Sequence, residues 1–185
     1  VKIVVIATSA FKEIGRGELQ DELTEYCWAN ELPLIGPNLV GMGSPALNFN
    51  CGFIPYLPTL GPVAMISQSG ANLLAALGTS QKDHYGMSFF VGLGNKADVD
   101  FSEFIAYAGK DDNTKCIAVY MEGLDSPEAF IEACQSVAKP VVAIKVGRSP
   151  IGVKAAFAHT ASENVRDDAY YDEVFAQAGA LRATT

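Results

Sequence analysis

The stretch PVAMISQSG, residues 62–70, decides the fold of this chain. Residues 63–66 form a continuous apolar run, which predicts a buried strand, and residues 67–70 lead from it into a helix that we expect to begin at Gly70. An apolar strand followed at once by a helix is the repeating unit of parallel α/β sheets. We therefore expect the chain to build such a sheet from Pro62 onward.

The same unit recurs toward the C-terminus. Further apolar runs predict strands at residues 88–91, 116–121 and 141–146. Predicted helices follow them from Phe101, Pro127 and about Asp167. Asp100 stands three residues before Glu103, as in a capping box, and Ser126 precedes a proline, as at a helix start. The alternation predicts a flavodoxin-like, doubly wound parallel sheet with helices on both faces.

The N-terminal part reads as a separate β-α-β unit. Residues 2–7 (KIVVIA) and 32–35 have strand character, and residues 17–30 place apolar side chains at helical spacing. Residues 36–61 are rich in Gly, Pro and Asn, which predicts a segment without regular structure. We expect a domain boundary there, with residues 1–40 in one domain, 41–61 as a linker and 62–185 as the second domain.

Composition excludes several classes of protein. With 185 residues, 49% of them hydrophobic, the chain can bury a core, and its net charge of -8 argues against a nucleic-acid partner. Its longest apolar runs are strand-sized, so no membrane segment is predicted. Four scattered cysteines and two histidines predict no metal site and reduced thiols, hence a cytoplasmic protein. Because the chain opens at Val1 inside a strand, we expect it to be a piece of a longer polypeptide.

Chemistry is expected where the parallel strands end. Residues 67–70 (SQSG) join a strand to a helix, so backbone N–H groups and the helix dipole favour an anion such as phosphate there. The alternative is that Ser67 or Ser69 only caps the helix. Glu122 ends another strand, where it either orients an imidazole or is simply solvated.

His159 lies in a stretch of small residues, KAAFAHTAS (154–162), that allows close backbone approach. A neutral imidazole can attack phosphorus, although a lone histidine is more often structural. Lys145 and Arg148, at the end of the strand predicted over 141–146, would add positive charge beside a phosphate.

Taken together, these motifs resemble the ADP-forming (NDP-forming) acyl-CoA and acetyl-CoA synthetases, which share an α-subunit plan with succinyl-CoA synthetase. The motifs that carry the resemblance are IGPN (35–38), ISQSG (66–70), GNKADVDF (94–101), YMEG (120–123), KVGRS (145–149) and AHT (158–160). Their order and spacing run across nearly the whole chain.

The resemblance implies roles for residues and domains. Residues 1–40 would be the C-terminal portion of a CoA-binding Rossmann-like domain, and 62–185 a flavodoxin-like phosphohistidine domain. His159 would be phosphorylated and Glu122 would steady it. The other implied groups are phosphate-binding Ser67, Gln68, Ser69, Gly70 and Ala71, acyl- and CoA-proximal Gly36, Pro37 and Asn38, and supporting Asn95, Lys145 and Arg148.

The implied reaction converts acyl-CoA, phosphate and a nucleoside diphosphate into free acid, CoA and the triphosphate, through an acyl phosphate and then phosphohistidine. It would use CoA, phosphate, and ATP/ADP or GTP/GDP with Mg²⁺ held by an ATP-grasp domain or subunit that these residues do not include. The expected partners are a small-molecule acid, its acyl-CoA and the ATP-grasp part, within an oligomer.

Three positions depart from the pattern: Ala161 replaces a glycine after the histidine, Leu39 a cysteine after GPN, and Ala10 a glycine in the first loop. Less glycine near His159 would restrict a loop that has to move. Two alternatives remain open. One is a non-catalytic, acyl-CoA-sensing domain of a larger protein, against which the presence of both His159 and Glu122 argues. The other is an FMN-binding flavodoxin-like carrier, since SQSGAN loosely resembles a flavin phosphate loop.

Overall fold

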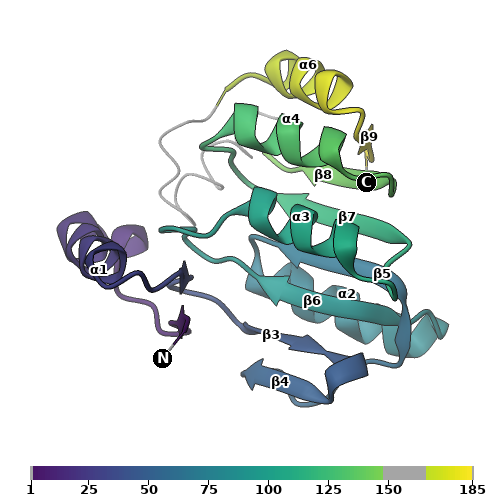
Figure 1. The fold of residues 1–185 in the computed structure, drawn as a ribbon, viewed down its shortest axis with the longest axis horizontal. Coiled ribbons are helices and arrows are strands. Elements are labelled where there is room, and N and C mark those ends of the chain that lie inside the picture. The colour runs from purple at the N-terminus through teal and green to yellow at the C-terminus, as the bar shows by residue number, and fades with distance from the viewer. Residues whose placement is uncertain (1, 148–165, 185) are drawn as a thin grey trace.

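The computed structural model describes residues 2–147 and 166–184. Within them, seven strands form one sheet in the order β4-β3-β6-β5-β7-β8-β9 (Figure 1). Their bounds are β3 Gly41–Ser44, β4 Phe49–Gly52, β5 Leu60–Ser67, β6 Met87–Gly92, β7 Cys116–Met121, β8 Val141–Lys145 and β9 Leu181–Arg182. Strands β5 to β9 pair in parallel. Their order, 6-5-7-8-9, is the flavodoxin arrangement 2-1-3-4-5, so the predicted fold class is confirmed.

Helices cover both faces of this sheet, as the strand–helix alternation predicted (Figure 1). On one face lie α3 (Phe101–Lys110), α4 (Pro127–Ser136) and α6 (Asp168–Ala178), side by side, and on the other lies α2 (Gly70–Asp83). Phe101, Phe130 and Phe175 bury the first face, and Leu73 and Leu77 of α2 pack with Phe90 on the second. The sheet is therefore a central layer whose strand ends are held rigidly by apolar packing.

The cap predicted for α3 is present, whereas the one predicted for α4 lacks its side-chain hydrogen bond. Asp100 and Glu103 form the capping box of α3, and the Asp167 carboxylate accepts from the N–H of Tyr170 at 2.9 Å to cap α6. Ser126 precedes Pro127 at the start of α4 but makes no side-chain cap. The capping box fixes where the loop after β6 ends.

The prediction that residues 36–61 lack regular structure is wrong. Strands β3 and β4 form a hairpin, with the short η2 helix (Pro45–Leu47) between them, and β3 pairs antiparallel with β6. A Cβ at Gly41 would lie 2.5 Å from the Cys51 carbonyl oxygen, and one at Gly43 would lie 2.5 Å from the Phe90 ring. The glycines thus permit close strand approach instead of breaking structure, and they remove the apolar alternation that marks a strand.

The N-terminal β-α-β unit is present, with shorter strands than predicted. Strands β1 (Val4–Val5) and β2 (Leu34–Ile35) pair in parallel in a separate two-stranded sheet, connected through η1 (Lys12–Ile14) and α1 (Gly17–Ala29). Figure 1 shows this unit beside the strand ends of the larger sheet. Its position lets the segment after β2 run directly past the carboxyl end of β5 and β6.

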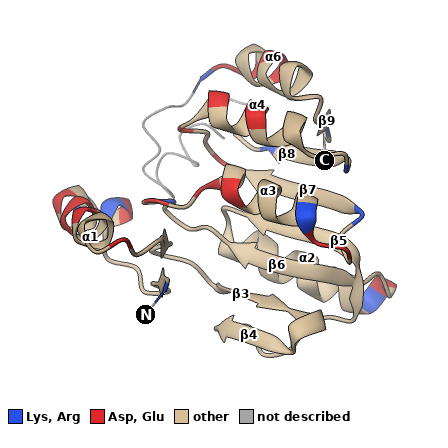
Figure 2. Cartoon of the chain, in the orientation of Figure 1, with Lys and Arg blue, Asp and Glu red and all other residues tan. Residues whose placement is uncertain are grey.

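Figure 2 shows where the charged residues lie along the fold. Acidic residues lie on α1 and at the starts of α3 and α4, while basic residues are scattered over several elements. Among the described residues, no helix is long and apolar enough to cross a membrane.

Candidate functional site

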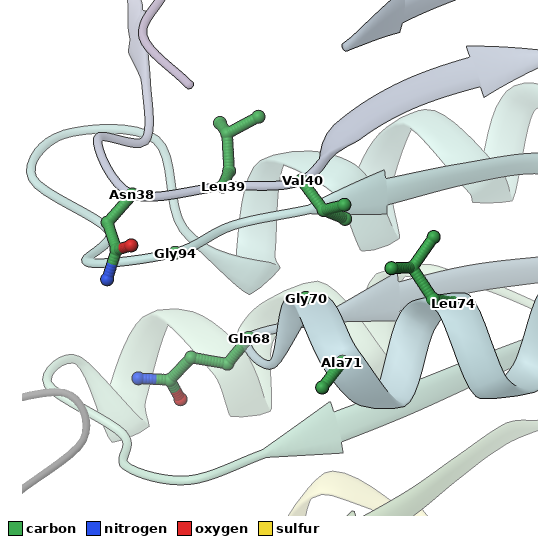
Figure 3. Close-up of a pocket in the computed structure, with 8 residues that line it drawn as sticks. All are labelled: Asn38, Leu39, Val40, Gln68, Gly70, Ala71, Leu74 and Gly94. Atoms are coloured by element: carbon green, nitrogen blue, oxygen red, sulfur yellow. The ribbon is translucent and has the colours of Figure 1, made fainter. Parts of the chain in front are cut away.

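A pocket of about 350 Å³ opens at the carboxyl ends of β5 and β6 (Figure 3). Its lining residues are Asn38, Leu39, Val40, Gln68, Gly70, Ala71, Leu74 and Gly94. We call residues 38–40 the N-terminal wall and the lining residues of the β5–α2 region, 68–74, the helix wall. In Figure 3 the Asn38 and Gln68 side chains reach toward one end of the pocket, and Val40 and Leu74 line the other. The pocket thus has a polar end and an apolar end.

The helix wall begins in the SQSG loop, which is part of the buried interior. Ser67, Gln68 and Ser69 are 0%, 4% and 3% exposed. The Ser67 hydroxyl donates to the Ser69 carbonyl at 2.8 Å, and the Ser69 Oγ accepts from the backbone N–H and the Nδ2 of Asn72 at 3.4 and 3.0 Å. The helix-cap interpretation of Ser69 is therefore confirmed.

The Ser69 cap leaves two N–H groups of this helix start available for an anion. The N–H groups of Gly70 and Ala71, in the first turn of α2, have no acceptor within residues 2–147 and 166–184. Both residues line the pocket, and the positive end of the helix dipole lies at the same point. An oxyanion placed there would complete the hydrogen bonds of the first helical turn.

Gln68 joins the SQSG loop to the loop that carries Glu122. Its Oε1 accepts from the backbone N–H groups of Glu122 and Gly123 at 2.9 and 3.0 Å, and its own N–H donates to the Tyr120 carbonyl at 3.0 Å. Glu122 is only 6% exposed. Burial, together with the nearby Glu122 charge, raises the pKa of Tyr120. Two of the predicted site segments, far apart in the sequence, are thus brought together.

Lys145 ends β8 and is buried, but it is not among the residues that line the pocket. Its ammonium donates to the Val146 carbonyl and lies 4.4 Å from the centre of the Tyr171 ring. Burial lowers the pKa of Lys145, and the carboxylates of Asp168 and Glu122 act in the opposite direction. The ammonium group of Lys145 and the carboxylate of Glu122 thus interact electrostatically, with Lys145 buried at the end of β8.

The N-terminal wall is held by a chain of side-chain amides. Asn38 Nδ2 donates to Asn95 Oδ1 at 3.2 Å, and Asn95 Nδ2 donates to Glu13 Oε2 at 2.6 Å and to Gln20 Oε1 at 3.0 Å. Burial raises the pKa of Glu13, but hydrogen bonds from Asn95 and from the N–H groups of Ala10 and Phe11 outweigh it, so the pKa lies below its usual value. A carboxylate thus anchors the network.

The GPN turn, which leads into the N-terminal wall, packs closely against Gly94 in the loop after β6. Gly94 has a φ of +60°, and a Cβ on it would lie 2.2 Å from the Pro37 carbonyl oxygen and 2.4 Å from that of Asn38. A Cβ on Gly36, whose φ is +98°, would lie 2.5 Å from the carbonyl oxygen of Ile6, which follows β1. Glycine at these two positions lets the GPN turn approach both the loop after β6 and the segment after β1.

Of the predicted site residues, Asn38, Gln68, Gly70 and Ala71 line one pocket, and Asn95 supports it. Gly36 and Pro37 are buried beside it, and Ser67 and Ser69 lie beneath it. His159 and Arg148 lie outside the described residues. Motif analysis missed Val40 and Leu74; Leu74 stands four residues after Gly70 on one helix face, which is a signal that could have revealed it.

Comparison with known proteins gives a consistent result. Residues 60–185 match the family model described as the succinyl-CoA ligase-like flavodoxin domain. The ADP-forming acetate–CoA ligase I of Archaeoglobus fulgidus is 40% identical over 100% of this chain, which covers 27% of that protein. The α-subunit of ADP-forming acetate–CoA ligase I of Pyrococcus furiosus is 38% identical, with 41% of it covered.

A solved structure is similar as well. The dinucleotide-forming acetyl-coenzyme A synthetase 1 of Candidatus Korarchaeum cryptofilum, in complex with phosphate and ADP, superposes with a TM-score of 0.92 at 37% identity. The match covers 100% of this chain and 40% of that one. The chain thus spans between about a quarter and two-fifths of the lengths of these relatives.

Proposed function

Because the chain belongs to the family of the succinyl-CoA ligase-like flavodoxin domain, we propose that it is part of an acid–CoA ligase of the NDP-forming kind. The proposed reaction interconverts acyl-CoA, phosphate and a nucleoside diphosphate with free acid, CoA and the triphosphate. Its proposed intermediates are an acyl phosphate and a phosphohistidine at His159.

One observation carries this proposal. The Gln68 side chain ties the Glu122 loop to a helix start whose first two N–H groups have no acceptor among the described residues. An oxyanion held by Gly70 and Ala71 would therefore lie beside a loop that carries a buried carboxylate. This arrangement suits phosphoryl transfer, which needs positioned donors for the phosphoryl oxygens and a carboxylate to orient an imidazole.

The pocket supports the proposed division of labour between its walls. Residues 67–71 would hold the phosphoryl group on the side of the helix wall, and Gly36, Pro37 and Asn38 would face it from the side of the N-terminal wall, near the acyl group and CoA. Asn95 supports Asn38 through a direct hydrogen bond. Lys145 would interact with the charge of Glu122, and Arg148 would add positive charge beside the phosphate. In this proposal residues 1–40 contribute to CoA binding and residues 41–61 connect them to the flavodoxin-like part.

The remaining parts of the proposal concern the larger protein. CoA, phosphate and ATP/ADP or GTP/GDP with Mg²⁺ would be used together with an ATP-grasp domain or subunit, in a cytoplasmic oligomer. Relatives named as ADP-forming ligases support the use of a nucleotide, and the one named as an α-subunit supports a further subunit. The segment alone is expected not to complete a cycle.

The direct test is a screen of carboxylic acids for CoA- and ATP-dependent thioester formation by the full-length protein. We expect thioester from at least one acid, with ADP and phosphate as co-products, or GDP and phosphate when GTP replaces ATP. A folded full-length protein that binds acyl-CoA but forms no thioester with any acid would instead support the sensing domain.

A further inference from the structure

The Gln68 amide has a fixed orientation in the pocket. Its Oε1 faces two backbone N–H groups, those of Glu122 and Gly123, which can only donate. Turning the amide over would place its own N–H groups against these donors, so the orientation is determined by chemistry. Nε2 makes no hydrogen bond within the part of the chain that the structure describes, although the residue is 4% exposed and lines the pocket. Gln68 therefore offers the pocket a donor.

The Asn38 amide is fixed in the opposite sense. Glu13 is ionised at neutral pH and can only accept, so the Nδ2 of Asn95 must face it and the Oδ1 of Asn95 must face Asn38. Asn38 donates to the Oδ1 of Asn95 through its own Nδ2, at 3.2 Å. Its Oδ1 has no donor among residues 2–147 and 166–184. Asn38 therefore presents an acceptor to the pocket. The Glu13 carboxylate sets the orientation of the Asn38 amide through the hydrogen bonds of Asn95.

The two amides reach toward the same end of the pocket (Figure 3). We propose that this end binds its ligands with fixed polarity. Gln68 Nε2 donates to a carboxyl or phosphoryl oxygen, and Asn38 Oδ1 accepts from a proton-bearing group of CoA, an amide N–H or the thiol. Glu13 and Asn95 are positioning residues that keep the Asn38 acceptor in place. The assignment of ligands rests on the proposed function, whereas the polarity rests on the hydrogen bonds alone.

Gln68→Glu separates the two tasks of this residue. A glutamate keeps the oxygen that accepts from Glu122 and Gly123 but replaces the pocket donor with a negatively charged acceptor. Titration calorimetry of the full-length protein with inorganic phosphate should show binding weakened on the order of 10- to 100-fold. The matched control is Gln135→Glu, an exposed glutamine on α4, which adds the same charge away from the pocket and should bind phosphate as the wild type does.

The positioning claim is tested by a double-mutant cycle. Asn38→Ala and Asn95→Ala should each weaken CoA binding by roughly 5- to 20-fold, and the double variant should be no weaker than Asn38→Ala, because Asn95 acts only through Asn38. Denaturant unfolding of every variant shows whether weaker CoA binding comes from a loss of fold. If Asn95 had only a structural role, independent of Asn38, the effects of the two substitutions on CoA affinity would multiply.

Three results would overturn the inference: unchanged phosphate affinity in folded Gln68→Glu, multiplying effects in the cycle, or a wild-type protein that binds neither CoA nor phosphate. Absence of thioester formation by a wild-type protein that shows the predicted affinities would count against the proposed function alone.

Discussion

The two walls of the pocket are built in different ways. The helix wall starts from residues 67–69, which are almost fully buried and bonded to their own loop, to α2 and to the backbone after β7. The N-terminal wall starts from Asn38, whose side chain is held by Asn95, 57 residues further along the chain. Asn95 in turn is held by Glu13 and Gln20, which lie 82 and 75 residues before it. The helix wall continues directly from β5 into α2, whereas the N-terminal wall lies between β2 and β3 and is tied through Asn38 to the loop after β6.

This difference suggests which wall can be changed without unfolding the domain. Moving the helix wall would break the hydrogen bonds of Gln68 with the end of β7 and the loop after it, whereas moving the N-terminal wall would break its hydrogen bonds with Thr8, Asn95 and Phe53. We therefore expect the N-terminal wall to be the less stable one, and the following predictions are ranked by expected effect.

Gly94→Ala should have the largest effect, because its Cβ would collide with two carbonyl oxygens of the GPN turn and its φ is positive. We expect a loss of about 2–4 kcal/mol in unfolding free energy and much weaker CoA binding, measured by denaturant titration and calorimetry. Gly78→Ala is the control: in α2 its Cβ would find only the Tyr56 hydroxyl at 3.9 Å, so stability should rise by about 0.5–1 kcal/mol. Equal outcomes for both glycines would contradict the close approach of the GPN turn to Gly94.

Asp98→Ala should release the N-terminal unit. Its carboxylate accepts from Trp28 Nε1 at 2.7 Å and from the buried Leu34 N–H at 2.9 Å. Losing both should cost about 1–3 kcal/mol, whereas Trp28→Phe, which loses only the exposed bond, should cost about 1 kcal/mol or less. Hydrogen exchange should quicken in residues 2–35 and stay unchanged in β5. Faster exchange in β5 to the same degree would mean that the walls are not independent.

Glu13→Gln should have the smallest effect, and one that depends on pH. The pKa of Glu13 is lower in the folded state than in the unfolded one, so its contribution is complete above the ordinary carboxyl range and is lost as pH falls through the folded value. The difference in unfolding free energy between wild type and variant should therefore shrink from pH 7 toward pH 3. A constant difference across this range would rule out the charged form as the anchor.

The sequence predicted the helix wall better than the N-terminal wall, for physical reasons. The starts at Gly70, Phe101 and Pro127 were predicted to the residue, because caps and apolar runs are local signals. The hairpin of β3 and β4 was missed because its glycines serve close packing across strands, which no local pattern records.

The site shows the same division. Gln68 and Gly70 could be placed because a loop after a strand faces the sheet edge, and they line the pocket. The contact of Asn95 with Glu13 joins residues 82 positions apart, and nothing near either residue indicates it. Val40, between β2 and β3, is a pocket residue that nothing in the sequence marks, and only the spacing of Leu74 from Gly70 hints at its place in the pocket. Long-range polar contacts and pocket shape are properties of the folded chain.

The central claim is that the pocket beside Glu122 serves phosphoryl transfer. Incubation of the full-length protein with γ-labelled ATP tests it most directly. We expect a covalent label that is acid-labile and base-stable, absent in His159→Ala and strongly reduced in Glu122→Gln, with both variants folded. A wild-type protein that takes up no label, or a label that persists in His159→Ala, would contradict the claim.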